Sequence, residues 1–175
     1  MKKLLVMAAI ALGLSQVQAQ ETSFGLTAGL NTMVIRNSVN VLGNTASASN
    51  SATGFYAGVF ADFEVSEKFH IQPELLYSTA YKDGNSTNTL NLPILAKYYV
   101  ADQFSIHAGP TLDYVLDESN GLNKFGFGVA AGLGYDFSDK VFATARYSLG
   151  LSNRIDNPIA SSKFDYLNVG IGFRF

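Results

Sequence analysis

The sequence predicts an all-β protein, an eight-stranded antiparallel up-and-down transmembrane β-barrel. Three observations lead to this fold class. Apolar residues alternate with small or polar residues in eight separate runs. Short and long connections alternate along the chain between these runs, and aromatic residues gather near the two ends of the runs. A period of two is that of an extended strand whose two faces meet different surroundings.

The clearest run covers residues 125–137. Its odd positions are apolar or aromatic, and its even positions are Gly, Ala or Asp. We predict that the odd face meets lipid. The even face, called the thin face because its side chains are small, is predicted to line the inside of a closed barrel. Asp136 is the only charged residue on that thin face, and burial requires a partner for it. Arg146 and Arg174 are the best candidates.

Residues 1–19 have the three parts of a signal peptide. Lys2 and Lys3 supply the positive charge, residues 4–14 are apolar, and residues 17–19 form a small-residue cleavage site. The apolar part is shorter than the ~20 residues of a membrane-spanning helix. We therefore expect residues 1–19 to be removed on export and residues 20–175 to form one outer-membrane β-barrel domain.

The composition narrows the choice of partners. The formal net charge is −2, which argues against nucleic acid as a partner, because that would require a basic face. The chain has no cysteine, so an exported domain of this size needs another source of stability than disulfides. A membrane supplies one.

The other seven runs repeat the pattern, and each is long enough to cross the hydrocarbon as a tilted strand of ~9–11 residues. They cover residues 24–34, 55–65, 69–81, 90–100, 104–114, 141–151 and 167–175. Proline removes a hydrogen bond from a strand ladder, so we expect local bulges at Pro73, Pro93 and Pro110, where the pattern leaves the exact strand boundaries open.

The connections between runs fall into two classes. Short polar turns are expected at residues 65–69, 100–104 and 137–141, and longer polar loops at residues 36–52, 82–88, 117–124 and 152–163. Outer-membrane barrels have short periplasmic turns and longer extracellular loops. The Ser-, Asn- and Ala-rich segment 36–52 is expected to be mobile.

Aromatic residues predict where the membrane surfaces lie, because such barrels carry an aromatic girdle at each interface. The girdle at the short-turn end is expected to contain Phe63, Phe69, Tyr98, Phe104, Phe137, Phe173 and Phe175. The girdle at the long-loop end is expected to contain Phe55, Tyr77, Tyr81, Tyr114, Phe125 and Phe127. In a soluble secreted sandwich, the rival fold, strand propensity explains how many aromatic residues there are but not where they lie.

Three segments resemble a known family: the leader, LNLPILAKYY at residues 90–99, and VGIGFRF at residues 169–175. They resemble the small outer-membrane β-barrel proteins of the PorT-type porin family, and the chain is similar to OmpA- and OmpX-like eight-stranded barrels. The resemblance implies a location in the outer membrane of a Gram-negative bacterium. It also implies that the terminal strand ending in Phe175 is read by the outer-membrane assembly machinery.

The inward positions predict a charged lumen. An eight-stranded barrel is just wide enough for side chains to fill it, so we expect the charges to pair into a plug. The alternative is a narrow pore for ions or small solutes. The expected inward polar residues are Asp62, Glu64, Glu74, Lys97, Asp113, Asp136, Arg146 and Arg174, with His70, Gln72, Asn91, His107, Thr144 and Asn168.

No catalytic, cofactor-binding or metal-binding residue is predicted, no cofactor is expected, and the protein is expected not to be an enzyme. His70 and His107 lack metal-ligand spacing, and both are interpreted as hydrogen-bonded lumen histidines. Serines in the loops have no histidine near them. The rim carboxylates Asp117, Glu118, Asp156 and Asp165 could activate water, but they match a solvated rim equally well.

The sequence thus predicts a non-enzymatic, monomeric barrel with a structural or surface-interaction role. It is held by outer-membrane lipids and exposes four extracellular loops to an unidentified partner. Two alternatives remain open at this point: the narrow pore, and a surface adhesin acting through residues 36–52 and 152–163.

Overall fold

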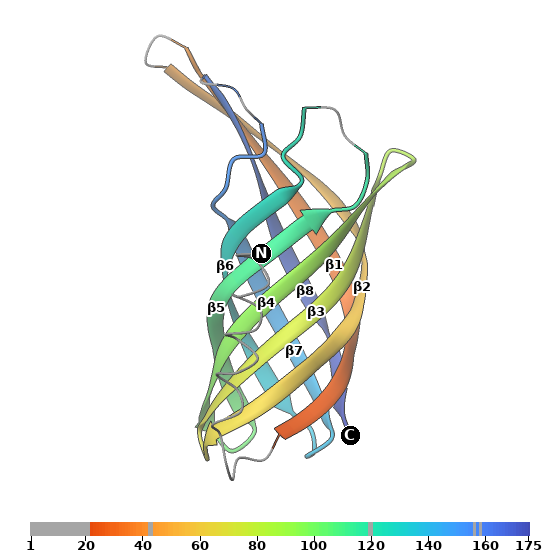
Figure 1. The fold of residues 1–175 in the computed structure, drawn as a ribbon, viewed down its shortest axis with the longest axis vertical. Coiled ribbons are helices and arrows are strands. Elements are labelled where there is room, and N and C mark those ends of the chain that lie inside the picture. Colours follow the sequence, from red (N-terminus) through yellow and green to blue (C-terminus); the bar gives the residue numbers. More distant parts are fainter. Residues whose placement is uncertain (1–21, 42–43, 119–120, 156, 158) are drawn as a thin grey trace, which may run out of the picture.

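Eight antiparallel strands close into one barrel in a computed structural model of the chain (Figure 1). Each strand pairs with its neighbour in sequence, and the last strand pairs with the first. This arrangement confirms the predicted fold class. The structure describes residues 22–41, 44–118, 121–155, 157 and 159–175, so the predicted signal peptide and the expected domain start at Gln20 lie outside the described residues.

The strands differ in length, and the first two are the longest. They are β1 (Thr22–Val41), β2 (Asn44–Ser66), β3 (Phe69–Lys82), β4 (Asn85–Ala101), β5 (Phe104–Val115), β6 (Phe125–Asp136), β7 (Val141–Gly150) and β8 (Ala160–Arg174).

The period of two becomes a barrel wall with an apolar outer face. In β6, the odd residues from Phe125 to Tyr135 are exposed, whereas Gly126, Gly128 and Ala130 are buried on the inner face. Large apolar side chains on the other strands are exposed in the same way, and they form a band around the barrel. A soluble protein rarely exposes so much contiguous apolar surface. Lipid is the natural surrounding of such a surface in an outer-membrane barrel. No helix among the described residues has the length and apolarity needed to cross a bilayer.

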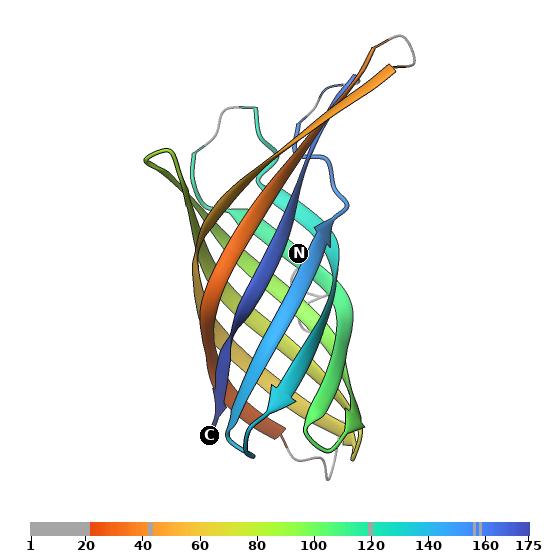
Figure 2. The same cartoon turned by 180° about the vertical axis from the view of Figure 1, so that it is seen from behind.

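The three predicted short turns lie together at one end of the barrel, beside the C-terminus (Figure 2). At the opposite end, the connections between β5 and β6 and between β7 and β8 are irregular loops, as predicted. The β3–β4 connection is shorter than the predicted loop 82–88. Asp83 and Gly84 both have positive φ values, 49° and 79°, and the two residues form the tight turn of a hairpin.

The prediction of an extended loop at residues 36–52 is wrong. β1 and β2 remain paired as far as Val41 and Asn44, so this segment is a long hairpin that rises above the barrel (Figure 1). β8 extends the same ladder, with Ala160 opposite Val39, which also turns residues 160–163 of the predicted last loop into strand. Backbone ladders form between small polar residues without an apolar face, so hydrophobic alternation did not reveal this extension. The expected mobility of the segment stays a prediction.

The bulges expected at Pro73, Pro93 and Pro110 are also absent. Strand register is the same on both sides of each proline, for example at Phe60↔Glu74 and Phe63↔Ile71 around Pro73. Each proline removes a single donor, and the neighbouring pairs hold the register. The register shifts lie instead beside two short turns, between Glu64 and Ser66 and between Tyr99 and Ala101.

Candidate functional site

The centre of the lumen is occupied by an ion pair that spans it. Arg146 on β7 donates from Nη1 to Oε1 of Glu74 at 2.9 Å and from Nη2 to Oε2 at 2.8 Å. Because β3 and β7 lie opposite each other in a ring of eight strands, this pair joins two facing walls. Gln72 donates to the same carboxylate at 2.9 Å. The two charged side chains are only 2% and 4% exposed, so they form a bidentate pair away from bulk solvent.

A second group of charges lies nearer the short-turn end. Asp62 on β2 accepts hydrogen bonds from Lys97 Nζ at 3.2 Å and pairs with His70 Nδ1 at 2.7 Å. The Lys97 ammonium also lies over the Tyr99 ring, 4.7 Å from its centroid. Asp62 therefore compensates a buried lysine and orients His70, which matches the role expected for a lumen histidine.

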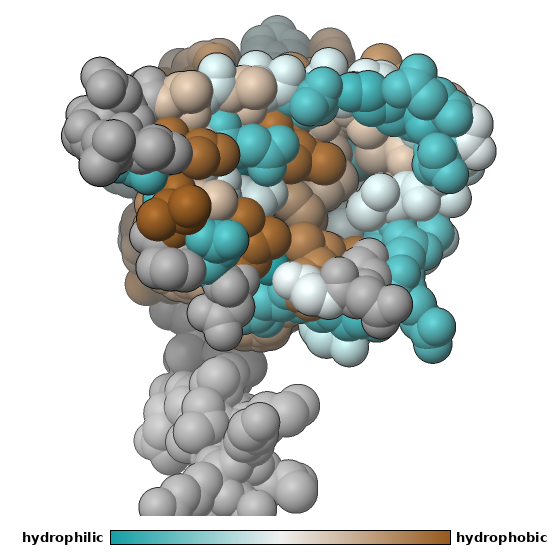
Figure 3. Space-filling model, turned by 90° about the horizontal axis from the view of Figure 1, so that it is seen from above, coloured by the Kyte–Doolittle hydropathy of each residue, from teal (hydrophilic) through white to brown (hydrophobic). Residues whose placement is uncertain are grey.

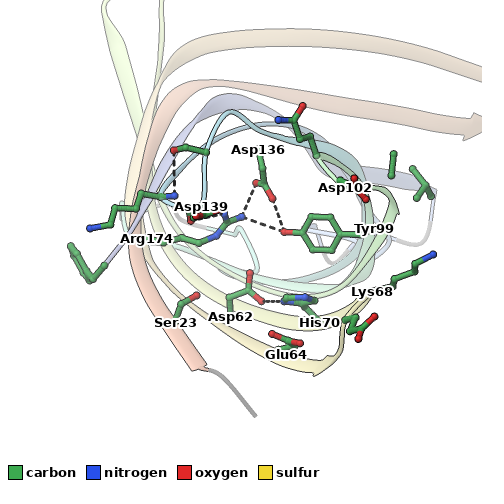
Figure 4. A pocket seen from close by; sticks show the side chains of 17 residues that line it. Ser23, Asp62, Glu64, Lys68, His70, Tyr99, Asp102, Asp136, Asp139 and Arg174 are labelled. Carbon is green, nitrogen blue, oxygen red and sulfur yellow. Dashed lines mark hydrogen bonds and ion pairs between the residues drawn. The ribbon is translucent and has the colours of Figure 1, made fainter.

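Of the two partners predicted for Asp136, Arg174 binds it, whereas Arg146 pairs with Glu74. Arg174 Nη2 donates to Asp136 Oδ1 at 2.8 Å, and the Tyr99 hydroxyl donates to Oδ2 at 2.7 Å. Together with Asp62 and His70, these side chains line a hollow of about 820 Å³ that is open at the short-turn end (Figure 4). The lumen is thus accessible from this end as far as the layer of Asp62 and Asp136. We call this hollow the vestibule.

The loop end of the lumen contains a residue that sequence reasoning missed. Arg154, in the loop between β7 and β8, reaches into the barrel, is 1% exposed and pairs with Asp113. Its guanidinium lies 4.7 Å from the ring centroid of Phe164, and its Nη1 donates to two carbonyl oxygens of the β5–β6 loop. A Cβ atom at Gly126 would collide with this guanidinium, so the glycine makes room for it. Loops carry no periodicity, and no signal marked this arginine.

Apolar side chains pack beside Arg154 at the same end of the lumen. The cluster consists of Met33, Ala80, Val115, Phe164 and Tyr166, with Ile35, Ala52 and Leu122 packed against it. Seen from the loop end, apolar residues gather toward the middle of this face, and hydrophilic residues occupy much of its rim (Figure 3). The loop end of the lumen therefore combines the buried Arg154–Asp113 pair with a cluster of apolar side chains.

The remaining candidate residues do not converge on a reactive centre. His107 bonds to Ser105 at 2.9 Å, but both are buried two positions apart on β5. Asp117 accepts hydrogen bonds from Asn88, Glu118 is exposed, and Asp156 lies outside the described residues. Within the described ranges, no group of three or more His, Asp or Glu side chains is arranged to hold a metal ion.

Asp165 differs from its expected place on a solvated rim. It is fully buried on the outer face of β8, where it pairs with Arg36 and accepts a hydrogen bond from Tyr147 at 2.7 Å. The period of two already placed it there, since Leu167 and Val169 face outward on the same strand. Its burial is explained by the cation that covers it.

The fold and the lumen define a transmembrane β-barrel of the outer-membrane class, with an apolar belt outside and paired charges inside. A family model described as outer membrane protein beta-barrel domain matches residues 16–156. The chain belongs to this family, and it is an outer-membrane protein of a Gram-negative bacterium. The resemblance to small outer-membrane barrels is thereby confirmed.

Two solved structures illustrate the likeness. Neisserial surface protein A shares 17% identity at a TM-score of 0.55, covering 89% of this chain and 99% of that one. Ail, the attachment invasion locus protein of Yersinia pestis, shares 13% identity at a TM-score of 0.50, covering 85% of this chain and 98% of that one. At these identities the likeness concerns the fold. No curated protein matches the chain.

Proposed function

We propose that the protein is a non-enzymatic, monomeric barrel whose lumen is sealed, and that it carries a surface-exposed hairpin in the outer membrane. The observation that supports the seal is the Glu74–Arg146 pair, which joins opposite walls at the centre. Arg154 and the apolar cluster add a second barrier at the loop end. Ser105 and His107 lie within hydrogen-bond distance of each other, but both side chains are buried, which supports a non-enzymatic role.

Purified protein refolded into planar bilayers is expected to give no steady openings, because eight strands leave little room beyond that filled by side chains. The measurement is single-channel current under applied voltage, with a sixteen-stranded porin as positive control. Glu74→Ala/Arg146→Ala protein serves as the matched variant, and its current noise should rise above that of the wild type. Discrete, long-lived openings from wild-type protein would reject the seal and favour the narrow pore.

The long β1–β2 hairpin supports the surface-interaction part of the proposal. It continues the barrel wall beyond the apolar band and exposes small polar side chains, among them Ser47, Ser49 and Ser51. The paired strands present these groups at regular spacing, and Lys82 on β3 donates to Asn50 at 2.8 Å. An adhesin acting through residues 36–52 would use this surface.

Shortening the hairpin by removing residues 38–47 is expected to abolish adherence of producing cells to host-cell monolayers, while the barrel still shows heat-modifiable gel mobility. The hairpin is the better of the two proposed adhesive segments to remove, because residues 152–163 include Arg154, which closes the lumen. Undiminished adherence of cells with the shortened, folded protein would contradict an adhesive role for this hairpin.

The lipid and assembly partners are also proposals. The outward apolar belt supports contact with outer-membrane lipid. Phe175 follows β8 and is 72% exposed, so its ring is available to the assembly machinery or to lipid. Its backbone N–H donates to the Phe24 carbonyl at 2.9 Å, which holds the terminal residue against β1 at the closing seam of the barrel.

A further inference from the structure

Three charged residues and a tyrosine lie together on the outer wall of the barrel, at the loop-side end of the apolar belt. They are Arg36 on β1, Lys163 and Asp165 on β8, and Tyr147 on β7. Arg36 takes the next outward position after Val34, and Asp165 and Lys163 take the next two after Leu167. Arg36 lies directly opposite Lys163 in the β1–β8 ladder, so two cations stand side by side outside the barrel.

The position along the strands places this pair of cations at the membrane surface. Below it, the outward residues of β1 run from Phe24 to Val34, and those of β8 run from Phe173 to Leu167. On β1 this largely apolar stretch, Phe24 to Val34, has the length of ~9–11 residues with which a tilted strand crosses the hydrocarbon. Arg36 and Lys163 therefore lie just above its loop-side edge, at the level of the lipid headgroups of the outer leaflet.

Arg36 is held in place by the buried carboxylate beneath it. Asp165 Oδ1 accepts from Arg36 Nη2 at 2.8 Å and from the Gly150 backbone N–H at 2.9 Å, while Tyr147 donates to Oδ2 at 2.7 Å. The Nη2 group also donates to the Gly150 carbonyl at 3.2 Å. These contacts fix the orientation of the guanidinium.

Donors remain free for a ligand after these bonds are made. The Arg36 side chain is 40% exposed, and its Nη1 group makes no hydrogen bond to any residue that the structure describes. Lys163, half-buried beside it, likewise has no hydrogen bond or ion pair among the described residues. Asp165 neutralises one of the two cations, so the site keeps one net positive charge.

We propose that Arg36 and Lys163 bind the phosphate of a lipid in the outer leaflet. A planar guanidinium and a neighbouring ammonium are the usual protein partners of phosphate oxygens. The acyl chains of such a lipid would pack on the outward apolar residues below, Val34 and Leu167, and on the ring of Tyr147. Asp165 acts through Arg36, as a positioning residue. The surface continues directly into the lipid-facing belt, which is why a membrane lipid is the occupant proposed.

The test is lipid binding by refolded protein in detergent micelles, measured by native mass spectrometry with diphosphoryl lipid A as the probe. Arg36→Gln/Lys163→Gln protein is expected to bind at least tenfold more weakly than wild type. Lys68→Gln/Lys140→Gln protein, which loses two cations at the short-turn end, is the matched control and should bind as wild type does. Lipid A lacking both phosphates should bind wild type as weakly as diphosphoryl lipid A binds the double variant.

A single variant separates binding from folding. Lys163→Gln leaves the Arg36–Asp165 pair intact, so the barrel should keep its heat-modifiable mobility while its affinity for the probe falls. Millimolar inorganic phosphate should not displace the lipid, since the chains contribute to binding. Equal affinity of wild type and Lys163→Gln, equal affinity for the dephosphorylated lipid, or displacement by free phosphate would each overturn the proposal.

Discussion

Arg146→Ala protein is expected to unfold with a free energy about 3–5 kcal/mol lower than that of the wild type. The substitution leaves the Glu74 carboxylate, 4% exposed, without either of its guanidinium bonds. A buried charge that loses its partner keeps its desolvation cost and loses its compensation. The measurement is reversible urea unfolding of protein refolded into lipid vesicles, followed by far-ultraviolet circular dichroism.

Two controls separate the loss of pairing from the loss of packing. Glu74→Leu/Arg146→Met removes both charges at similar volume and should cost clearly less than Arg146→Ala, because it leaves no unpaired charge and removes only the acceptor of the Gln72 amide. Arg174→Ala breaks a pair whose side chains are 11% and 14% exposed at the vestibule, and it should cost less than Arg146→Ala. If Arg146→Ala were as stable as the wild type, the central pair would not be holding the lumen together.

Ala131→Arg protein is expected to lose about 2–4 kcal/mol of stability in the same vesicles. Ala131 is exposed and lies at the midpoint of the outward residues of β6 and its following turn, between Phe125 and Phe137. An arginine there would place its guanidinium in the middle of the hydrocarbon. At an exposed site in water, the same substitution would change stability by about 0.5 kcal/mol or less.

Ala131→Leu is the matched variant, since it adds bulk at the same place without charge and should remain close to wild type. A gap between the Arg and Leu variants in vesicles is what a lipid-facing wall requires. Should the two variants unfold at the same urea concentration, the outer face of β6 would not be in contact with hydrocarbon.

The barrel wall could be predicted from the sequence because each strand alternates on its own. Asp136 is the only charged residue on the thin face of β6, and its burial predicted an inward-facing cation as its partner. Arg174 is that cation. The pairing of Glu74 with Arg146 could not be read in the same way, since it depends on which strands face each other across the ring. Alternation assigns a face to each residue and leaves distances across the lumen open.

Other residues were missed for different physical reasons. Arg154 enters the lumen from a loop, where no period applies. Arg36 and Asp165 do continue the alternation, since they lie two positions beyond Val34 and before Leu167, respectively. Polar residues at the end of an apolar run, however, predict the start of a loop. The hairpin above them was missed because strand pairing between serines and alanines carries no hydrophobic signal.

Under the proposed seal, the two ends of the lumen differ, and the barrel interior is a blind-ended well. The vestibule is open to water as far as the layer of Asp62 and Asp136, whereas the proposed barrier at the other end contains the apolar cluster around Met33 and Phe164. We expect solutes on the short-turn side to reach into the membrane's thickness and, if the proposed seal holds, solutes on the loop side to stop at its surface. By the rule for outer-membrane barrels, the well opens to the periplasm. The charged interior thus shares the solvent of that compartment, while the cell exterior meets only the hairpin, the loops and the cap that Arg154 holds in place.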